Sequence, residues 1–191
     1  MGIPGLQLIP NFVSEAAATA ALSAIDEAPW RADLGRRVQH YGWVYDYKRR
    51  AVDPSMHLGP LPGWARPLAA RLHASAGFEA EPDQLIVNEY VPGQGISKHV
   101  DCKPCFGPVI ASLSLGGATT MVLQRGKEGP KHELRLLPRS LLVLAEDARY
   151  LWTHMIPARK SDVVDGQRAL RGRRVSLTFR TVIVQSRATR R

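Results

Sequence analysis

The sequence predicts a mainly β fold with flanking helices. From Gln84 onward, short β-branched runs such as LIVNEY, PVIASLSL and RVSLTFRTVIV are separated by turn residues, without intervening helical patterns. This spacing is typical of an antiparallel sandwich or barrel of seven or eight strands. The composition is that of a packed chain, because 45% of the 191 residues are hydrophobic and 23% are charged. We expect one domain, 1–191, with N-terminal helices and a lid at about 1–83, the β core at about 84–185 and a basic tail at 186–191.

Two helices are expected before the strands. Ser14 can cap a helix that runs to about residue 28, where Pro29 stops it. A second helix, at about 64–76, places Leu68 and Leu72 on one face. We therefore expect both helices to pack on the core through their apolar faces.

The segment between the two helices has a different pattern. Tyr41, Trp43 and Tyr45 alternate with other residues, so a strand would place the three rings on one face. This arrangement predicts a hairpin or a lid at about 35–50.

The charge balance favours an anionic partner. The chain has 26 basic and 17 acidic residues, a formal net charge of +9, and ten basic residues against two acidic ones lie between Pro157 and Arg191. Nucleic acid is the specific partner that this surplus indicates, and a solvated basic face is the alternative. The sequence contains neither a membrane-spanning apolar run nor a signal-peptide pattern, so we expect a soluble, cytoplasmic protein that does not bind membranes.

The two cysteines, Cys102 and Cys105, are spaced C-x-x-C. Two cysteines exclude a framework of several disulfides. A redox pair and half of a zinc site are alternatives, and we expect two reduced thiols without a special role.

A metal site is indicated by His99 and Asp101, because residues i and i+2 of an extended strand project to the same side. His154, on a late strand, is a candidate third ligand. Two histidines and one carboxylate leave three positions open on an octahedral ion, as Fe(II) oxygenase chemistry requires. Taken alone, the H-x-D motif is a weak signal, and a surface His–Asp pair explains it better than a metal site.

A late strand carries a second constellation of polar residues. Arg174, Ser176, Thr178 and Arg180 share one face of the expected strand, opposite three apolar residues. Guanidinium groups bind carboxylates bidentately, so this face suits a dicarboxylate co-substrate. Phosphate contacts on a solvated face are the alternative. On an earlier strand, Asn88 and Tyr90 also stand at i and i+2 and could complete a carboxylate site.

Several motifs occur together in one order: NEYVPGQGISKHVD, SLSLG, PRSLLVL, RYLWTH and RVSLTFR. Between about Gln39 and Val184, the sequence resembles the AlkB family of Fe(II)/2-oxoglutarate-dependent dioxygenases. Through VQHYG, PDQL, PGQGI and RYLWTH it is particularly similar to the dioxygenase domain of the AlkB homologue that modifies tRNA wobble uridines.

The resemblance implies a double-stranded β-helix (jelly-roll) core with a nucleotide-recognition lid. It implies Fe(II) as the metal, 2-oxoglutarate as co-substrate and O2 as oxidant, with catalytic metal ligands His99, Asp101 and His154. It further implies the co-substrate contacts: Arg174 and Ser176, helped by Tyr90, hold the distal carboxylate, and Asn88 and Arg180 support the chelating end.

The family acts on single-stranded or flipped-out nucleotides, so nucleic acid is the implied partner. Packing of the aromatic rings onto the barrel is the alternative to stacking on a base. Lys103 stands where the founding AlkB member has an acidic residue that contacts the base, so base preference does not carry over. The candidate nucleic-acid contacts are Arg36, Arg37, Tyr41, Trp43, Tyr45, Lys48, Arg49, Arg50 and Lys103.

The function implied is oxidative demethylation of alkylated bases in single-stranded DNA or RNA, tRNA included, with release of formaldehyde, succinate and CO2. One alternative is hydroxylation of a wobble-uridine substituent in tRNA, and another is a non-catalytic nucleic-acid-binding module. We expect a monomer.

Overall fold

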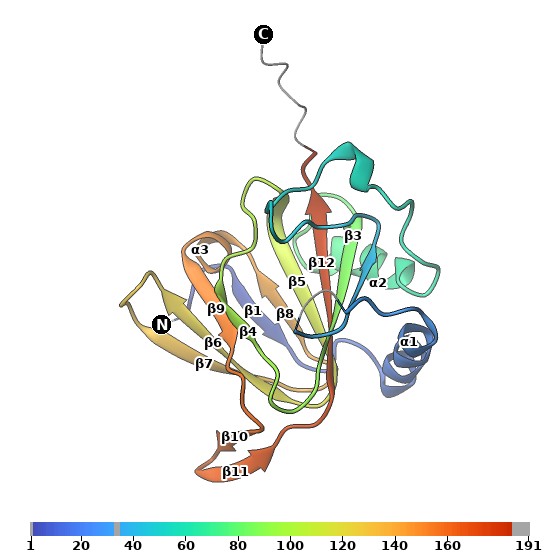
Figure 1. Cartoon of the computed structure of the whole chain (residues 1–191). Coiled ribbons are helices and arrows are strands. Elements are labelled where there is room, and N and C mark those ends of the chain that lie inside the picture. The colour runs from blue at the N-terminus through green and yellow to red at the C-terminus, as the bar shows by residue number, and fades with distance from the viewer. Residues whose placement is uncertain (1, 33–34, 185–191) are drawn as a thin grey trace.

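Two antiparallel sheets form the centre of the molecule, which confirms the predicted mainly β fold (Figure 1). The computed structural model describes residues 2–32 and 35–184, so the predicted basic tail at 186–191 lies outside the described residues. The larger sheet has the strand order β1 (Leu6–Ile9), β8 (Leu141–Leu144), β5 (Phe106–Gly116), β12 (Arg174–Val182), β3 (Gln84–Tyr90) and β2 (Val38–Tyr41).

A smaller sheet completes the jelly-roll core. Its strand order is β4 (Ile96–His99), β9 (Trp152–Ile156), β6 (Thr119–Arg125) and β7 (Lys131–Leu136). A separate hairpin of β10 (Ser161–Val164) and β11 (Gln167–Leu170) projects away from both sheets (Figure 1). The sequence pattern does not predict this hairpin.

The two predicted helices are present and cover the larger sheet (Figure 1). Helix α1 spans Glu15–Glu27, and the Ser14 hydroxyl accepts the Ala17 N–H at 3.2 Å, as the capping prediction requires. Helix α2 spans Arg66–Ser75. The short helices η1 (Pro54–Met56) and α3 (Glu146–Tyr150) complete the set found in the described residues.

Strand β12 divides its side chains between the core and the site. Val175, Leu177 and Phe179 are 0% exposed and join the core cluster that also contains residues of α1 and α2. Each such burial contributes about 1.5–3 kcal/mol of stability. The alternate residues, from Arg174 to Arg180, line a cavity on the opposite face, as the period of two predicts.

The N-terminal segment contributes more than helices and a lid. Strand β1 pairs with β8 and β2 pairs with β3, so residues before Gln84 supply both edges of the larger sheet. Gly42 follows β2 with a φ of +76°, and a Cβ there would lie 1.8 Å from the Asp83 carbonyl oxygen. This glycine therefore ends the strand and turns the chain into the segment that crosses the site.

Among the described residues, we find no helix long and apolar enough to span a membrane.

Candidate active site

His99, Asp101 and His154 converge on one point, with their ligand atoms all within 4.8 Å of one another. His99 and His154 are paired residues of β4 and β9, and their rings are 4.3 Å apart. Asp101 follows β4 in a loop, and its Oδ2 lies 3.8 Å from His154 Nε2. The His99 Nδ1 lies 2.8 Å from the Ser97 carbonyl oxygen. With a proton on that nitrogen, Nε2 keeps a lone pair for a metal.

The electrostatics of Asp101 and His154 favour their metal-binding forms. Burial by itself would raise the pKa of Asp101, but the neighbouring Arg180 guanidinium, followed by His154 and His99, outweighs it and holds that pKa well below its usual range. Burial, followed by the neighbouring His99, lowers the pKa of His154 to about 4. At neutral pH the site thus offers a carboxylate and a neutral imidazole from these two residues.

Arg180 orients the carboxylate of Asp101. Its Nη2 donates to Asp101 Oδ1 at 2.7 Å, which leaves Oδ2 on the side of His154. Its Nη1 donates to Gln84 Oε1 at 3.2 Å. The resemblance implies that Asn88 and Arg180 support the chelating end of the co-substrate; both line the cavity, where Asn88 Oδ1 accepts from Arg36 Nε at 2.9 Å. The two predicted partners therefore have separate contacts in this structure.

Arg174 lies at the other end of the same face and is 2% exposed. Its Nη2 donates to the Ser114 hydroxyl at 2.9 Å and approaches that of Ser176 at 3.4 Å. Among the described residues, nothing accepts a hydrogen bond from its buried Nε or Nη1. Tyr90 lies beside the group, with its ring centroid 5.5 Å from the guanidinium carbon. Two unpaired donors on a buried cation are the complement of a carboxylate.

One cavity of about 340 Å³ joins these parts. Four arginines line it, against the single carboxylate of Asp101. The lining arginines are Arg36, Arg50, Arg174 and Arg180. The cavity therefore suits anionic ligands around a cation.

The comparisons with known proteins agree with this geometry. The family model described as 2OG-Fe(II) oxygenase superfamily matches residues 5–180. The chain belongs to this superfamily, within its AlkB family. An Arabidopsis thaliana protein named "Alkylated DNA repair protein ALKBH8 homolog" is 39% identical over 95% of this chain and 59% of its own length. The mouse "tRNA (carboxymethyluridine(34)-5-O)-methyltransferase ALKBH8" is 34% identical over 94% of this chain.

This AlkB-family chain spans 30% of the mouse relative and under two thirds of the Arabidopsis one. Among solved structures, OsALKBH1 superposes with a TM-score of 0.73 at 17% identity. The match covers 95% of this chain and 98% of OsALKBH1, so the two share a fold.

The residues fit the Fe(II) and 2-oxoglutarate that the family uses. Two imidazoles and one carboxylate are the ligand set of non-haem Fe(II) oxygenases. The unpaired Nε and Nη1 of Arg174 fit the distal carboxylate of 2-oxoglutarate. Iron would be held by His99, Asp101 and His154.

The predicted lid aromatics do not share one face. Tyr41 packs edge-on against Trp64, and its hydroxyl donates to Gln39. The Trp43 ring packs at a tilt against His57, with the ring centroids 4.5 Å apart, and its indole N–H donates to Asp83. Only Tyr45 of the predicted three lines the cavity. The expectation fails because β2 ends at residue 41, and the turn at residue 42 breaks the alternation.

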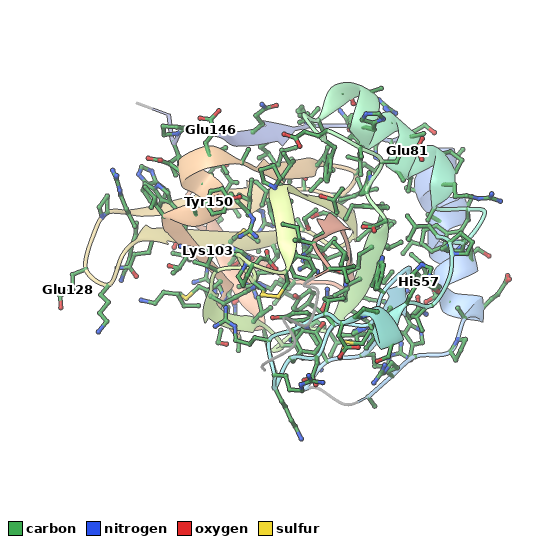
Figure 2. The ribbon with its side chains drawn as sticks, turned by 90° about the horizontal axis from the view of Figure 1, so that it is seen from above. His57, Glu81, Lys103, Glu128, Glu146 and Tyr150 are labelled. Carbon is green, nitrogen blue, oxygen red and sulfur yellow. A yellow bond between two sulfur atoms is a disulfide. The ribbon has the colours of Figure 1, made fainter. Side chains whose placement is uncertain are left out.

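The basic candidates also divide. Arg36 and Arg50 line the cavity, whereas Arg37 binds Glu89 through two hydrogen bonds of 2.6 and 2.7 Å. Lys48 and Arg49 are exposed in a turn on the lid. Lys103, labelled in Figure 2, is exposed in the loop after Asp101.

Three residues of this AlkB-family site were missed from sequence. Tyr47 lines the cavity and meets Tyr45 edge-on at 5.0 Å, and it continues the odd-numbered aromatic series by one step. Gln84 accepts a hydrogen bond from Arg180 through its Oε1 and donates one to the Trp43 carbonyl at 3.2 Å. Arg149, 2% exposed, donates to the main-chain carbonyls of residues 101, 102 and 107. No sequence pattern marks a buried arginine that donates its hydrogen bonds to main-chain carbonyls.

The expectation of reduced thiols is wrong for this structure, because Cys102 and Cys105 form a disulfide. Their Cα atoms are 5.3 Å apart, a separation that a disulfide spans readily. The short loop between them brings the two side chains together.

Proposed function

We propose that this protein is an Fe(II)/2-oxoglutarate-dependent dioxygenase that oxidatively demethylates alkylated bases in single-stranded DNA or RNA, including tRNA. Formaldehyde, succinate and CO2 are the products. Repair of alkylation damage is the role that this activity would serve. The observation that carries the proposal is the single cavity in which the three metal-binding side chains, the unpaired donors of Arg174 and the lid tyrosines meet.

The chain's own residues position and protect the reactants. Bound Fe(II) supplies activation of O2 with 2-oxoglutarate as the electron donor. Arg174 binds the distal carboxylate, and Arg180 keeps one oxygen of Asp101 occupied so that the other faces the metal.

The lid supports a nucleic-acid substrate. A target base must leave its stack to reach a buried metal, and Tyr45 and Tyr47 offer rings against which a base could stack. Arg36 and Arg50 at the cavity suit phosphate groups, as do the exposed Lys48 and Arg49 on the loop of Arg50 and the exposed Lys103 on the loop after Asp101. Relatives named as nucleic-acid demethylases, including "DNA N6-methyl adenine demethylase" from Caenorhabditis elegans, support this substrate class.

A second candidate is hydroxylation of a wobble-uridine substituent in tRNA. It is favoured by the higher identity to proteins carrying the ALKBH8 name than to those named as demethylases. The two candidates differ in product, because hydroxylation leaves a stable hydroxyl on the RNA without loss of formaldehyde.

The test is turnover on a panel of methylated DNA and tRNA oligonucleotides with Fe(II), 2-oxoglutarate and O2, followed by mass spectrometry. Demethylated product with formaldehyde supports the proposal, and a product that stays heavier by one oxygen and releases no formaldehyde supports the second candidate. His99→Ala and Asp101→Ala should abolish 2-oxoglutarate consumption while the fold persists. Binding of oligonucleotides without any oxidised product would instead indicate a binding module.

A further inference from the structure

The Cys102–Cys105 pair lies in the wall of the active site and has no part in the chemistry proposed above. Cys102 directly follows Asp101 and lines the cavity. Both cysteines are 4% exposed. Lys103, the residue that follows Cys102, is labelled in Figure 2 and marks the loop that contains the two cysteines. A redox change here therefore occurs within the loop that carries a metal-binding carboxylate.

Both sulfur atoms face one atom of the lid. The Sγ of Cys102 lies 3.4 Å from the Arg50 carbonyl oxygen, and the Sγ of Cys105 lies 3.3 Å from it. The Arg50 guanidinium reaches the same loop, because its Nη2 donates to the Val100 carbonyl at 3.3 Å. Arg50 is thus the residue at which the lid touches the metal-binding loop through both its main chain and its side chain.

The backbone of Arg50 is held in an unusual conformation. Its φ is +50°, in the left-handed region that side chains other than glycine's disfavour. Such a conformation persists only when surrounding contacts hold it. Contacts between the lid and the cysteine loop are therefore suited to fix this segment.

We propose that Cys102 and Cys105 are a thiol–disulfide redox site, and that the lid, which touches the disulfide in this structure, is held more firmly over the active site when the two cysteines are reduced. Each thiol can donate a weak S–H···O hydrogen bond to the Arg50 carbonyl, whereas a disulfide has no hydrogen to donate. Oxidation thus removes two donors that converge on one acceptor. The effect on lid closure is of the order of tenfold.

The redox step balances by exchange with a small disulfide. One thiolate attacks the small disulfide and releases one small thiol, and the second cysteine then displaces the other small thiol. Two cysteine thiols become the Cys102–Cys105 disulfide, and the small disulfide is reduced to two thiols. The inference rests on the proposed function only in assigning the lid to substrate binding.

Reciprocity gives the site a second property. If reduced thiols favour the closed lid, then a substrate that closes the lid must make the thiols harder to oxidise, by the same factor. Bound single-stranded nucleic acid should therefore raise the equilibrium fraction of reduced thiols in the small-disulfide buffer.

Two double variants separate the donors from the disulfide. Cys102→Ser with Cys105→Ser keeps hydroxyl donors for the Arg50 carbonyl and cannot form a disulfide. Cys102→Ala with Cys105→Ala removes the donors and is also insensitive to oxidants. The serine variant should resemble reduced wild type, and the alanine variant should resemble the oxidised protein.

The first readout is tryptic cleavage of the full chain at the exposed Lys48 and Arg49 of the lid. We expect cleavage about tenfold faster in the oxidised protein and the alanine variant than in the reduced protein and the serine variant. The second readout is affinity for a single-stranded methylated oligonucleotide, with Mn(II) and 2-oxoglutarate bound, which should fall by a similar factor on oxidation. Circular dichroism melting checks that both double variants fold.

Equal cleavage rates in all four proteins would overturn the redox site, even if the enzyme demethylates its substrate. A redox-dependent cleavage rate in a protein that oxidises no oligonucleotide would uphold the redox site and reject the proposed function. Oxidation that changes cleavage while the serine and alanine variants behave alike would refute the role of the thiol donors.

Discussion

Arg174→Lys should weaken the binding of 2-oxoglutarate far more than that of nucleic acid. Two buried nitrogens of Arg174, Nε and Nη1, donate no hydrogen bond to any described residue, and the third, Nη2, donates to the Ser114 hydroxyl. A lysine can offer the co-substrate one such bond where the guanidinium offers two. The loss of one charge-assisted hydrogen bond, about 1.5–3 kcal/mol, corresponds to a Kd roughly 10- to 150-fold higher.

The protonation state adds to this effect. Burial lowers the pKa of Arg174 to about 10, so the arginine stays charged at neutral pH. A lysine begins from a lower pKa, and the same burial lowers it further, so part of the variant is neutral. Its affinity for 2-oxoglutarate should therefore recover in part as the pH falls, whereas that of the wild type should not.

The assay is calorimetric titration of 2-oxoglutarate into the Mn(II)-loaded protein. Ser114→Ala is the matched control, because it removes the contact to Nη2 and leaves the two free donors in place. A change below threefold for Arg174→Lys would refute the assignment of this arginine. A loss confined to oligonucleotide binding would show that the residue contacts phosphate.

Three further predictions concern stability, metal binding and the substrate side. Asp162→Asn should lower the free energy of unfolding by about 3 kcal/mol, or Tm by roughly 6–12 °C, because the buried Asp162 carboxylate accepts hydrogen bonds from three arginines. Calorimetry should show this loss and little change for the control variant Asp165→Asn, whose side chain is exposed. The arginines hold the pKa of Asp162 below its usual range despite burial, so its contribution is complete above about pH 4 and declines in stronger acid. A stability difference between wild type and D162N that does not shrink below about pH 4 would contradict this assignment. Arg149→Lys should lower Mn(II) affinity about tenfold by loosening the metal-binding loop, as a paramagnetic resonance titration can measure, and unchanged affinity would assign Arg149 to folding alone. Tyr47→Ala should weaken oligonucleotide binding about 5- to 100-fold in an anisotropy titration and leave 2-oxoglutarate binding unchanged. Trp43→Ala should leave both affinities unchanged. Equal losses of oligonucleotide affinity in the two variants would assign both rings to packing.

The alternating strand residues could be predicted from sequence because a regular strand has a fixed period. Arg174 and Ser176 face the cavity as that period requires, and Leu177 faces the core. The metal-binding side chains of His99 and Asp101 also converge as expected, although Asp101 lies just beyond its strand.

The lid could not be predicted in the same way because it is irregular. Its rings take their positions from individual contacts, such as that of Trp43 with Asp83, rather than from a period. Strand β1 was missed because four residues between turn-forming glycine and proline carry too short a pattern. The partner of Arg180 depends on which carboxylate lies nearest in space, and sequence spacing does not contain that distance.

The central position of β12 makes this strand less tolerant of backbone change than the lid. This strand is hydrogen-bonded on both sides, by β5 and β3, and any change in its backbone must propagate into the whole sheet. The lid tyrosines that we propose as base contacts, Tyr45 and Tyr47, lie instead outside the strands of both sheets. Substitutions in the lid can therefore reshape that side of the cavity while the strand that carries Arg174 and Arg180 stays unchanged.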